Sequence, residues 1–276
     1  MNARGSSQQF RQRVVIVTGA SGGLGAAIAR ALAAEGAQVT LTARNADRLR
    51  QTAADLQRAT GGNFLAVPCD VTHRAEVDHL IAQTLAHYGR IDGLINNAGT
   101  GMVAPVEFVA GADAVALFQT NFFGALHCIQ ASLPHLKQQR GGFIVNIASI
   151  SGLRAIPNLA IYSASKAALI ALSDSLRLEL RDFDISVSVI CPSRIADTEF
   201  FDHLKCYGPL KLYTGHQSVS PTAVAAALLE AIRNRRRLVI LPADAQRLYH
   251  VNKIAPQLVD RLLFKKMPTL EKAQPQ

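Results

Sequence analysis

The feature that most constrains the fold is a regular alternation of short apolar runs with longer helical patterns. Seven runs rich in β-branched residues recur along the chain, at Val14–Val17, Val39–Thr42, Phe64–Val67, Gly93–Ile95, Phe143–Ile147, Ser186–Ile190 and Leu238–Leu241. Between them lie helical patterns at Leu24–Glu35, Ala46–Thr60, Ala75–Tyr88, Ala112–Gln138, Tyr162–Asp182 and Pro221–Asn234. Continuous apolarity is typical of strands covered on both faces. We therefore predict an α/β fold with a doubly wound, seven-stranded parallel sheet flanked by helices.

The length and composition fit one globular domain. The chain has 276 residues, 49% of them hydrophobic and 18% charged, which is not the composition of a disordered protein. A single α/β domain of about 250 residues is a normal size. We expect this domain over residues 1–242. Two segments without the alternation, Ser193–Ser220 and Pro242–Gln276, are predicted to be irregular.

The net charge of +9 is concentrated in the C-terminal extension, residues 243–276, and just before it. The last 44 residues hold 10 Lys and Arg against 3 Asp and Glu, whereas residues 1–232 hold 19 against 17. The main body therefore shows no nucleic-acid signal, and we expect no nucleic-acid partner.

The cysteines and the N-terminus indicate an intracellular protein. Four widely spaced cysteines, at 69, 128, 191 and 206, have no metal-site spacing, so we expect reduced thiols and no bound metal. Residues 1–13 are polar, and the apolar run that follows is too short for a signal peptide or a membrane span. We expect a cytoplasmic location.

A glycine-rich turn joins the first predicted strand to the first predicted helix. It runs Thr18-Gly19-Ala20-Ser21-Gly22-Gly23-Leu24-Gly25. Glycines let the backbone approach a pyrophosphate, and the helix N-terminus supplies free N–H groups and a positive dipole. The alternative is a tight turn with no ligand. The strand before and the helix after favour dinucleotide binding.

Further motifs follow in order along the chain. Asn96-Asn97-Ala98-Gly99 follows the fourth strand, Asn121 lies on a predicted helix, and Ser149 ends the fifth strand. Thirteen residues later comes Tyr162-Ser163-Ala164-Ser165-Lys166. Together with the glycine turn, these elements resemble the T-G-x-x-x-G-x-G, N-N-A-G and Y-x-x-x-K motifs of the short-chain dehydrogenase/reductase family. The resemblance spans about residues 13–242 and implies a Rossmann fold and an oxidoreductase.

Tyr162 and Lys166 are four residues apart, so on a helix their side chains share one face. A tyrosine has a pKa of about 10, and a nearby ammonium and an oxidised nicotinamide would lower it. Our hypothesis is that Tyr162 exchanges a proton with the substrate oxygen. The resemblance implies that Ser149 binds the same oxygen, that Lys166 also binds the nicotinamide ribose, and that Asn121 holds a relay water.

The residues after the second and third strands bear on the cofactor. Arg44 can pair with a 2′-phosphate, and no acidic residue stands beside it to bind an adenosine ribose, so NADP(H) is favoured over NAD(H). Gly22 departs from the Lys or Arg that NADP-using relatives often have there. The resemblance places Asp70 and Val71 at the adenine, although Asp70 could instead cap the next helix.

Other expected cofactor contacts are Gly19, Ser21, Gly22, Gly23, Leu24, Gly25, Asn97, Ala98, Gly99, Tyr162, Lys166 and Ile195. Ile195 would meet the nicotinamide carboxamide. The motif before it is altered, because Cys191-Pro192-Ser193 replaces the Pro-Gly of the family. Serine leaves that backbone less free than glycine.

The resemblance also implies a substrate lid at about residues 197–220. Its apolar residues, Phe200, Phe201, Leu204, Tyr207, Leu210, Leu212 and Tyr213, are compatible with an apolar substrate or with a loop that packs on its own core. A steroid, a fatty-acyl ketone and a hydrophobic xenobiotic ketone all fit. The predicted function is NADP(H)-dependent interconversion of a ketone or aldehyde and an alcohol, that is, a carbonyl reductase.

The extension at 243–276 mixes apolar and basic residues, and Pro256 divides it into two helices. Such segments can lie on anionic membranes, dock on the body or contact another subunit. The family implies a homodimer or homotetramer, formed through the helices that carry Asn121 and Tyr162. The alternative function is a non-catalytic dinucleotide sensor or a membrane-associated scaffold, which would have no need of the Ser149, Tyr162 and Lys166 arrangement.

Overall fold

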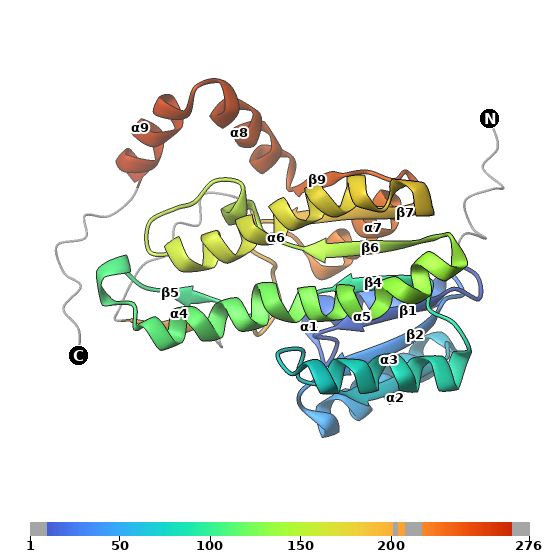
Figure 1. The fold of residues 1–276 in the computed structure, drawn as a ribbon. Coiled ribbons are helices and arrows are strands. Elements are labelled where there is room, and N and C mark those ends of the chain that lie inside the picture. Colours follow the sequence, from blue (N-terminus) through green and yellow to red (C-terminus); the bar gives the residue numbers. More distant parts are fainter. Residues whose placement is uncertain (1–9, 201–203, 208–216, 267–276) are drawn as a thin grey trace.

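The structure, a computed structural model, describes residues 10–200, 204–207 and 217–266. A parallel sheet of seven strands forms its centre (Figure 1). The strands are β1 (Val14–Thr18), β2 (Gln38–Ala43), β3 (Phe64–Pro68), β4 (Gly93–Asn96), β6 (Gly142–Ile147), β7 (Ile185–Pro192) and β9 (Leu238–Leu241). All seven predicted strands are confirmed, as is the fold class.

The strand order is β3-β2-β1-β4-β6-β7-β9. The chain winds outward from β1 to β3, returns to the middle, and winds outward the other way from β4 to β9. All pairings in this sheet are parallel, with Val15 opposite both Val39 of β2 and Gly93 of β4. The order reverses between β1 and β4, and in open α/β sheets ligands bind at the carboxyl ends of the strands beside such a reversal.

Helices cover both faces of the sheet. On one face α1 (Gly23–Ala34), α2 (Ala46–Thr60) and α7 (Pro221–Arg233) share a buried cluster with the strands, and on the other α3 (Arg74–Tyr88), α5 (Gly124–Gln139) and α6 (Ala160–Glu179) do so. Residues of β1 alternate between the two clusters: Val15 and Val17 pack on one side and Ile16 on the other. This explains why the strands are apolar throughout.

One predicted helix, Ala112–Gln138, is interrupted. The structure has α4 (Gly111–Phe118), then a π-helical turn η2 (Gln119–Phe123), then α5. π turns are rare and are often found at functional sites. This one carries Asn121.

Smaller elements complete the described chain. The 3₁₀ turns are η1 (Val106–Phe108), η3 (Ile150–Gly152) and η4 (Arg181–Phe183), and a short parallel pair joins β5 (Met102–Val103) to β8 (Lys205–Cys206). The described part of Pro242–Gln276 is not irregular: it forms α8 (Ala243–Ile254) and α9 (Pro256–Lys266), the two helices divided at Pro256 that the sequence also predicted. Proline lacks the N–H that a helix interior needs but is tolerated in the first turn, so Pro256 begins the second helix.

Within residues 10–200, 204–207 and 217–266, no helix combines the length and apolarity needed to cross a membrane.

Candidate active site

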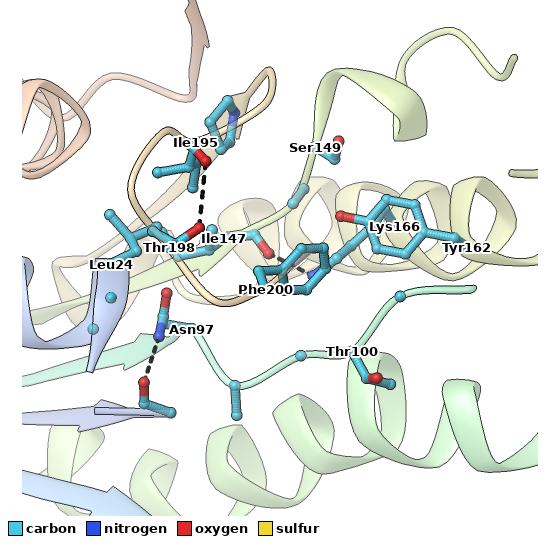
Figure 2. Close-up of a pocket in the computed structure, with 18 of the residues that line it drawn as sticks. Leu24, Asn97, Thr100, Ile147, Ser149, Tyr162, Lys166, Ile195, Thr198 and Phe200 are labelled. Atoms are coloured by element: carbon cyan, nitrogen blue, oxygen red, sulfur yellow. Dashed lines mark hydrogen bonds between the residues drawn. The ribbon is translucent and has the colours of Figure 1, made fainter. Parts of the chain in front are cut away.

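A cavity of about 870 Å³ opens at the carboxyl ends of the strands. Its walls come from the glycine turn after β1, the loops after β2, β3, β4 and β6, helix α6, and the segment after β7. Every predicted site residue except Asn121 lines it, so the structure brings together side chains from along nearly the whole domain. Figure 2 shows part of this pocket, with Tyr162, Lys166 and Phe200 on one side and Leu24 and Asn97 on another.

The glycine turn is built for close backbone contact. Gly19 has φ 64°, and a Cβ there would lie 2.8 Å from the Ala98 Cα. A Cβ on Gly25 would lie 2.3 Å from the Gly19 carbonyl oxygen. Only glycine fits either position. The turn can therefore fold tightly against the loop after β4 while α1 begins above it.

Hydrogen bonds fix the turn to the loop after β4. The Thr18 hydroxyl accepts from the backbone N–H groups of Asn97 and Ala98, at 3.0 and 2.9 Å. The Asn97 amide nitrogen donates to the carbonyl oxygens of Thr18 and Gly19, at 2.9 and 3.0 Å (Figure 2). The Asn97 amide nitrogen thus holds the two loops together, a role that the sequence prediction of a cofactor contact did not include.

Ser149, Tyr162 and Lys166 meet at the carboxyl end of β6. Ser149 lies two residues beyond the strand, not at its end as predicted, and caps η3 by accepting from the Ser151 N–H at 3.2 Å. Tyr162 and Lys166 are one turn apart on α6. The Lys166 ammonium lies 5.9 Å from the centre of the Tyr162 ring and donates to the Ile147 carbonyl oxygen at 3.0 Å. Lysine and tyrosine therefore share one wall of the cavity.

Burial decides the protonation of this pair. It raises the pKa of Tyr162 to about 12, against a smaller lowering by the Ser149 hydroxyl. It lowers the pKa of Lys166 to about 8, because the charged form loses its hydration. The expected lowering of the tyrosine pKa is thus not found in this structure, where the ammonium is directed at Ile147. Tyr162 is held as a neutral phenol, which is a proton donor.

Asn121 lies behind the cavity wall. Its side chain is 1% exposed, accepts from the Thr100 N–H at 2.8 Å, and donates to the Thr100 carbonyl oxygen at 2.9 Å and the Ser165 hydroxyl at 3.0 Å. A Cβ on Gly99 would lie 3.2 Å from the Asn121 amide oxygen and 3.3 Å from the Lys166 nitrogen. The π turn thus brings Asn121 and Lys166 to the same glycine. The Asn121 side chain supports the loop that carries Thr100.

The other end of the cavity suits an anion. Arg44 lines it just before α2, whose N-terminus is capped by the Asn45 side chain, an acceptor for the Arg48 N–H at 3.0 Å. Asp70 also lines it and accepts from the N–H and hydroxyl of Thr72, at 3.0 and 2.8 Å. Although burial opposes it, these bonds and the nearby Arg44 hold the pKa of Asp70 below its usual value. Asp70 caps a turn here, while α3 starts later, at Arg74.

The segment after β7 crosses the cavity. Ile195 pairs with Val219, and the Thr198 hydroxyl donates to the Ile195 carbonyl oxygen at 3.3 Å (Figure 2). The Phe200 ring lies 6.2 Å from that of Tyr162. Leu204 lines the cavity as well, and Tyr207 packs against the cluster beside it. Four predicted lid residues, Phe201, Leu210, Leu212 and Tyr213, lie outside the described residues.

Part of the cavity lining was not predicted from the sequence. Helices α8 and α9 contribute Ala245, Leu248, Tyr249 and Leu263 to the cavity. Val259 and Leu263 are buried, and Asp260 forms an ion pair with Arg154 after η3. The apolar spacing of the extension was visible in the sequence, and of the three predicted placements, docking on the body is observed. Arg48, described below, is a further residue that was not predicted.

Cys69, Cys128 and Cys191 are buried, Cys206 is exposed, and all four are free thiols. Among the described residues no group of His, Cys, Asp and Glu could hold a metal ion.

Comparisons with known proteins point in one direction. The short chain dehydrogenase family model matches residues 13–205. A ketoacyl reductase of a Nostoc species is 34% identical over 256 residues, which cover 91% of this chain and 88% of that protein. A short-chain dehydrogenase/reductase from Burkholderia phymatum, solved with NAD, superposes with a TM-score of 0.82 at 26% identity, covering 91% of this chain and 96% of the other. An alcohol dehydrogenase from Thermococcus sibiricus, solved with 5-hydroxy-NADP, gives a TM-score of 0.74 at 26% identity, covering 84% and 96%.

Proposed function

The chain belongs to the short-chain dehydrogenase/reductase family of oxidoreductases, and from this premise we propose that it is an NADP(H)-dependent enzyme that interconverts a ketone or aldehyde with an alcohol. The observation that carries the proposal is the meeting of Ser149, Tyr162 and Lys166 on one wall of a cavity whose other end is formed by the glycine turn. A nicotinamide dinucleotide is the cofactor of the solved neighbours.

The residues present fit such a cofactor. The tight glycine turn exposes backbone at the start of α1, where a pyrophosphate would lie against free N–H groups. Asp70 and Val71 would border the adenine, Lys166 would bind the nicotinamide ribose, and Ile195 would meet the carboxamide. When bound, the nicotinamide supplies hydride to the carbonyl carbon or accepts it from the alcohol.

The proton chemistry belongs to Tyr162. A phenol held neutral by burial donates its proton to the carbonyl oxygen during reduction, and the phenolate form of Tyr162 accepts the proton of the alcohol during oxidation. Ser149 hydrogen-bonds the same oxygen and orients it. Lys166 lies one helical turn away, and its charge would stabilise the phenolate once the ammonium turns from the Ile147 carbonyl oxygen toward the Tyr162 ring. Asn121, across Gly99 from Lys166, would hold a water that relays protons from it.

NADP(H) is the proposed form of the cofactor. Arg44 lines the cavity beside the N-terminus of α2, and both favour a phosphate on the adenosine ribose. The run from Leu41 to Asn45, which spans the end of β2 and the residues after it, has no carboxylate to bind a free ribose diol.

The substrate that we propose is apolar. Beside Tyr162 the cavity is lined by Phe200, Leu204, Leu248, Tyr249 and Leu263. These described residues of the segment after β7 and of α8 and α9 would thus border a steroid, an acyl chain or a xenobiotic ketone. The Nostoc relative is named a ketoacyl reductase, and this name supports an acyl substrate among the three.

A non-catalytic dinucleotide sensor or a membrane-associated scaffold is the rival function. The ammonium of the buried Lys166 costs free energy to desolvate, and a sensor does not need it. Nor does a sensor need this lysine one helical turn from Tyr162 in the same cavity. The arrangement of these side chains favours the enzyme.

We further propose a cytoplasmic protein that associates with itself and with anionic membranes. Val115, Phe123 and Leu178 are exposed apolar residues on α4, the π turn and α6, the helices expected to pair between subunits. Val251, Ile254, Leu258 and Leu262 are exposed on α8 and α9, with Arg247, Lys253 and Arg261 exposed beside them. An apolar face bordered by cations suits an anionic lipid surface.

The experiment that tests the function is a spectrophotometric screen. Oxidation of NADPH and of NADH is followed at matched concentrations with acyl ketones, steroid ketones and aromatic ketones. We expect turnover with NADPH on at least one apolar class and weaker turnover with NADH. Turnover with NADH alone would overturn the cofactor assignment, and dinucleotide binding without turnover on any class would favour the sensor.

A further inference from the structure

Arg48 reaches from α2 across the glycine turn. Its Nε donates to the Ser21 carbonyl oxygen at 2.9 Å, and its Nη1 donates to the Glu199 carboxylate at 2.6 Å. Its Nη2 lies 2.8 Å from the position that a Cβ on Gly22 would take. The guanidinium is therefore held against the turn, at the wall of the cavity, although 27 residues separate Arg48 from Ser21 in the sequence.

The surroundings of Arg48 form an anion site. Arg44 and Arg48 both line the cavity, Asn45 caps the helix between them, and Ser21 and Gly22 provide the facing wall. Two guanidinium groups beside a helix N-terminus match a phosphate dianion, because arginine donates two parallel hydrogen bonds to such a group.

We propose that Arg48 acts with Arg44 as the second cation that recognises a 2′-phosphate on the adenosine ribose, and that Glu199 competes with this phosphate for Arg48. The inference rests on the proposed NADP(H) dependence and assigns a specificity-determining residue to it. The guanidinium also occupies the space beside Gly22, so a side chain at this position would have to displace it.

Glu199 makes the site adjustable. It belongs to the segment after β7, and both side chains of the pair are about half exposed, at 45% and 54%. Water screens an ion pair of this kind, so a doubly charged phosphate can displace the carboxylate. Glu199 would then leave Arg48 when the phosphate binds. Because Thr198 and Phe200 lie on the same segment, the position of this segment would differ between bound NADP(H) and bound NAD(H).

The test uses adenosine 2′,5′-bisphosphate and AMP, which differ by the 2′-phosphate, and isothermal titration of the full chain. We expect Arg48→Gln to weaken the bisphosphate by roughly tenfold or more relative to AMP. Glu199→Gln removes the competing charge and should strengthen the bisphosphate while leaving AMP unchanged. Arg50→Gln is the matched control: Arg50 lies on the same helix, pairs with Asp47, and is not among the cavity-lining residues. It should change neither affinity.

The outcomes separate the two proposals. If the unmodified chain prefers the bisphosphate and Arg48→Gln keeps that preference, the role of Arg48 is overturned and the NADP(H) proposal stands. If the unmodified chain binds both ligands equally or neither, the NADP(H) proposal fails and the inference fails with it. Circular dichroism of the variants checks that each is folded, so that a loss of binding is not a loss of structure.

Discussion

At the scale of single residues, the buried Lys166 ammonium has the largest consequence. It is 4% exposed and donates a hydrogen bond to the Ile147 carbonyl oxygen. A buried charge with so few partners costs free energy, which points to a purpose other than stability. Its position one turn from Tyr162 on α6 provides that purpose in the proposed reaction.

Lys166 should make stability depend on pH. Burial lowers its pKa from 10.5 to about 8, so between these values the unfolded chain binds more protons than the folded one. The contribution of Lys166 to the free energy of unfolding therefore rises with pH across this window, by on the order of 3 kcal/mol. We expect any stability advantage of Lys166→Met over the unmodified chain to shrink between pH 8 and pH 10.5. Urea unfolding at several pH values measures it, and an advantage that grows with pH would refute the assignment.

Most site residues could be predicted because ordered motifs carry them, and the cavity gathers those motifs. Arg48 and Glu199 could not. Their ion pair joins positions 151 residues apart, and nothing in the local sequence of either one indicates the other. The raised pKa of Tyr162 was also missed, since burial and the direction of the Lys166 ammonium are properties of the packed structure.

At the scale of elements, the glycine turn has the strictest packing requirement. A methyl group on Gly25 would lie 2.3 Å from the Gly19 carbonyl oxygen and 2.8 Å from the Ala20 Cα. Neither contact involves a flexible side chain, so the turn would have to open.

We expect Gly25→Ala to destabilise the chain by roughly 1–3 kcal/mol through overpacking and to weaken dinucleotide binding. Gly111→Ala, at the start of α4, is the control, because a Cβ there meets nothing within 4 Å. It should be neutral or gain about 0.4–1 kcal/mol. Urea unfolding compares the two; equal effects would mean that the turn is not packed as described.

The larger elements followed from the sequence because their patterns are long. Each of the seven apolar runs became a strand of the sheet, whereas the two-residue strands β5 and β8 are too short to show a period. The π turn at Gln119–Phe123 could not be predicted from the sequence either, because apolar residues continue through it at nearly helical spacing.

At the scale of the whole molecule, the C-terminal helices form part of the cavity wall. From the sequence, docking on the body was one of three possible placements for them. One side of α8 and α9 supplies Leu248, Tyr249 and Leu263 to the cavity, and another leaves Ile254 and Leu258 exposed, at 87% and 50%. In Figure 1 the two helices project from the body at the edge of the sheet beyond β9. A spacing pattern shows that a helix has an apolar side but not what that side contacts.

The exposed side should bind anionic lipid. We expect the chain to co-sediment with phosphatidylserine-containing vesicles at low salt, and Ile254→Ser with Leu258→Ser to reduce this binding severalfold. Val106→Ser, which changes an apolar residue that is 62% exposed on η1, is the control and should bind as the unmodified chain does. Absence of co-sedimentation at low salt would reject the membrane proposal and leave the cavity-lining role of α8 and α9 intact.

The account as a whole depends on the Tyr162 hydroxyl as the group that exchanges a proton with the substrate. The most direct measurement is the turnover of Tyr162→Phe on a carbonyl substrate found in the screen, together with its affinity for NADPH followed by cofactor fluorescence. Removing one oxygen should lower kcat by about a hundredfold or more, because general acid catalysis is lost, while the NADPH affinity stays within a few-fold of the unmodified value. A variant that turns over at nearly the unmodified rate would contradict the mechanism.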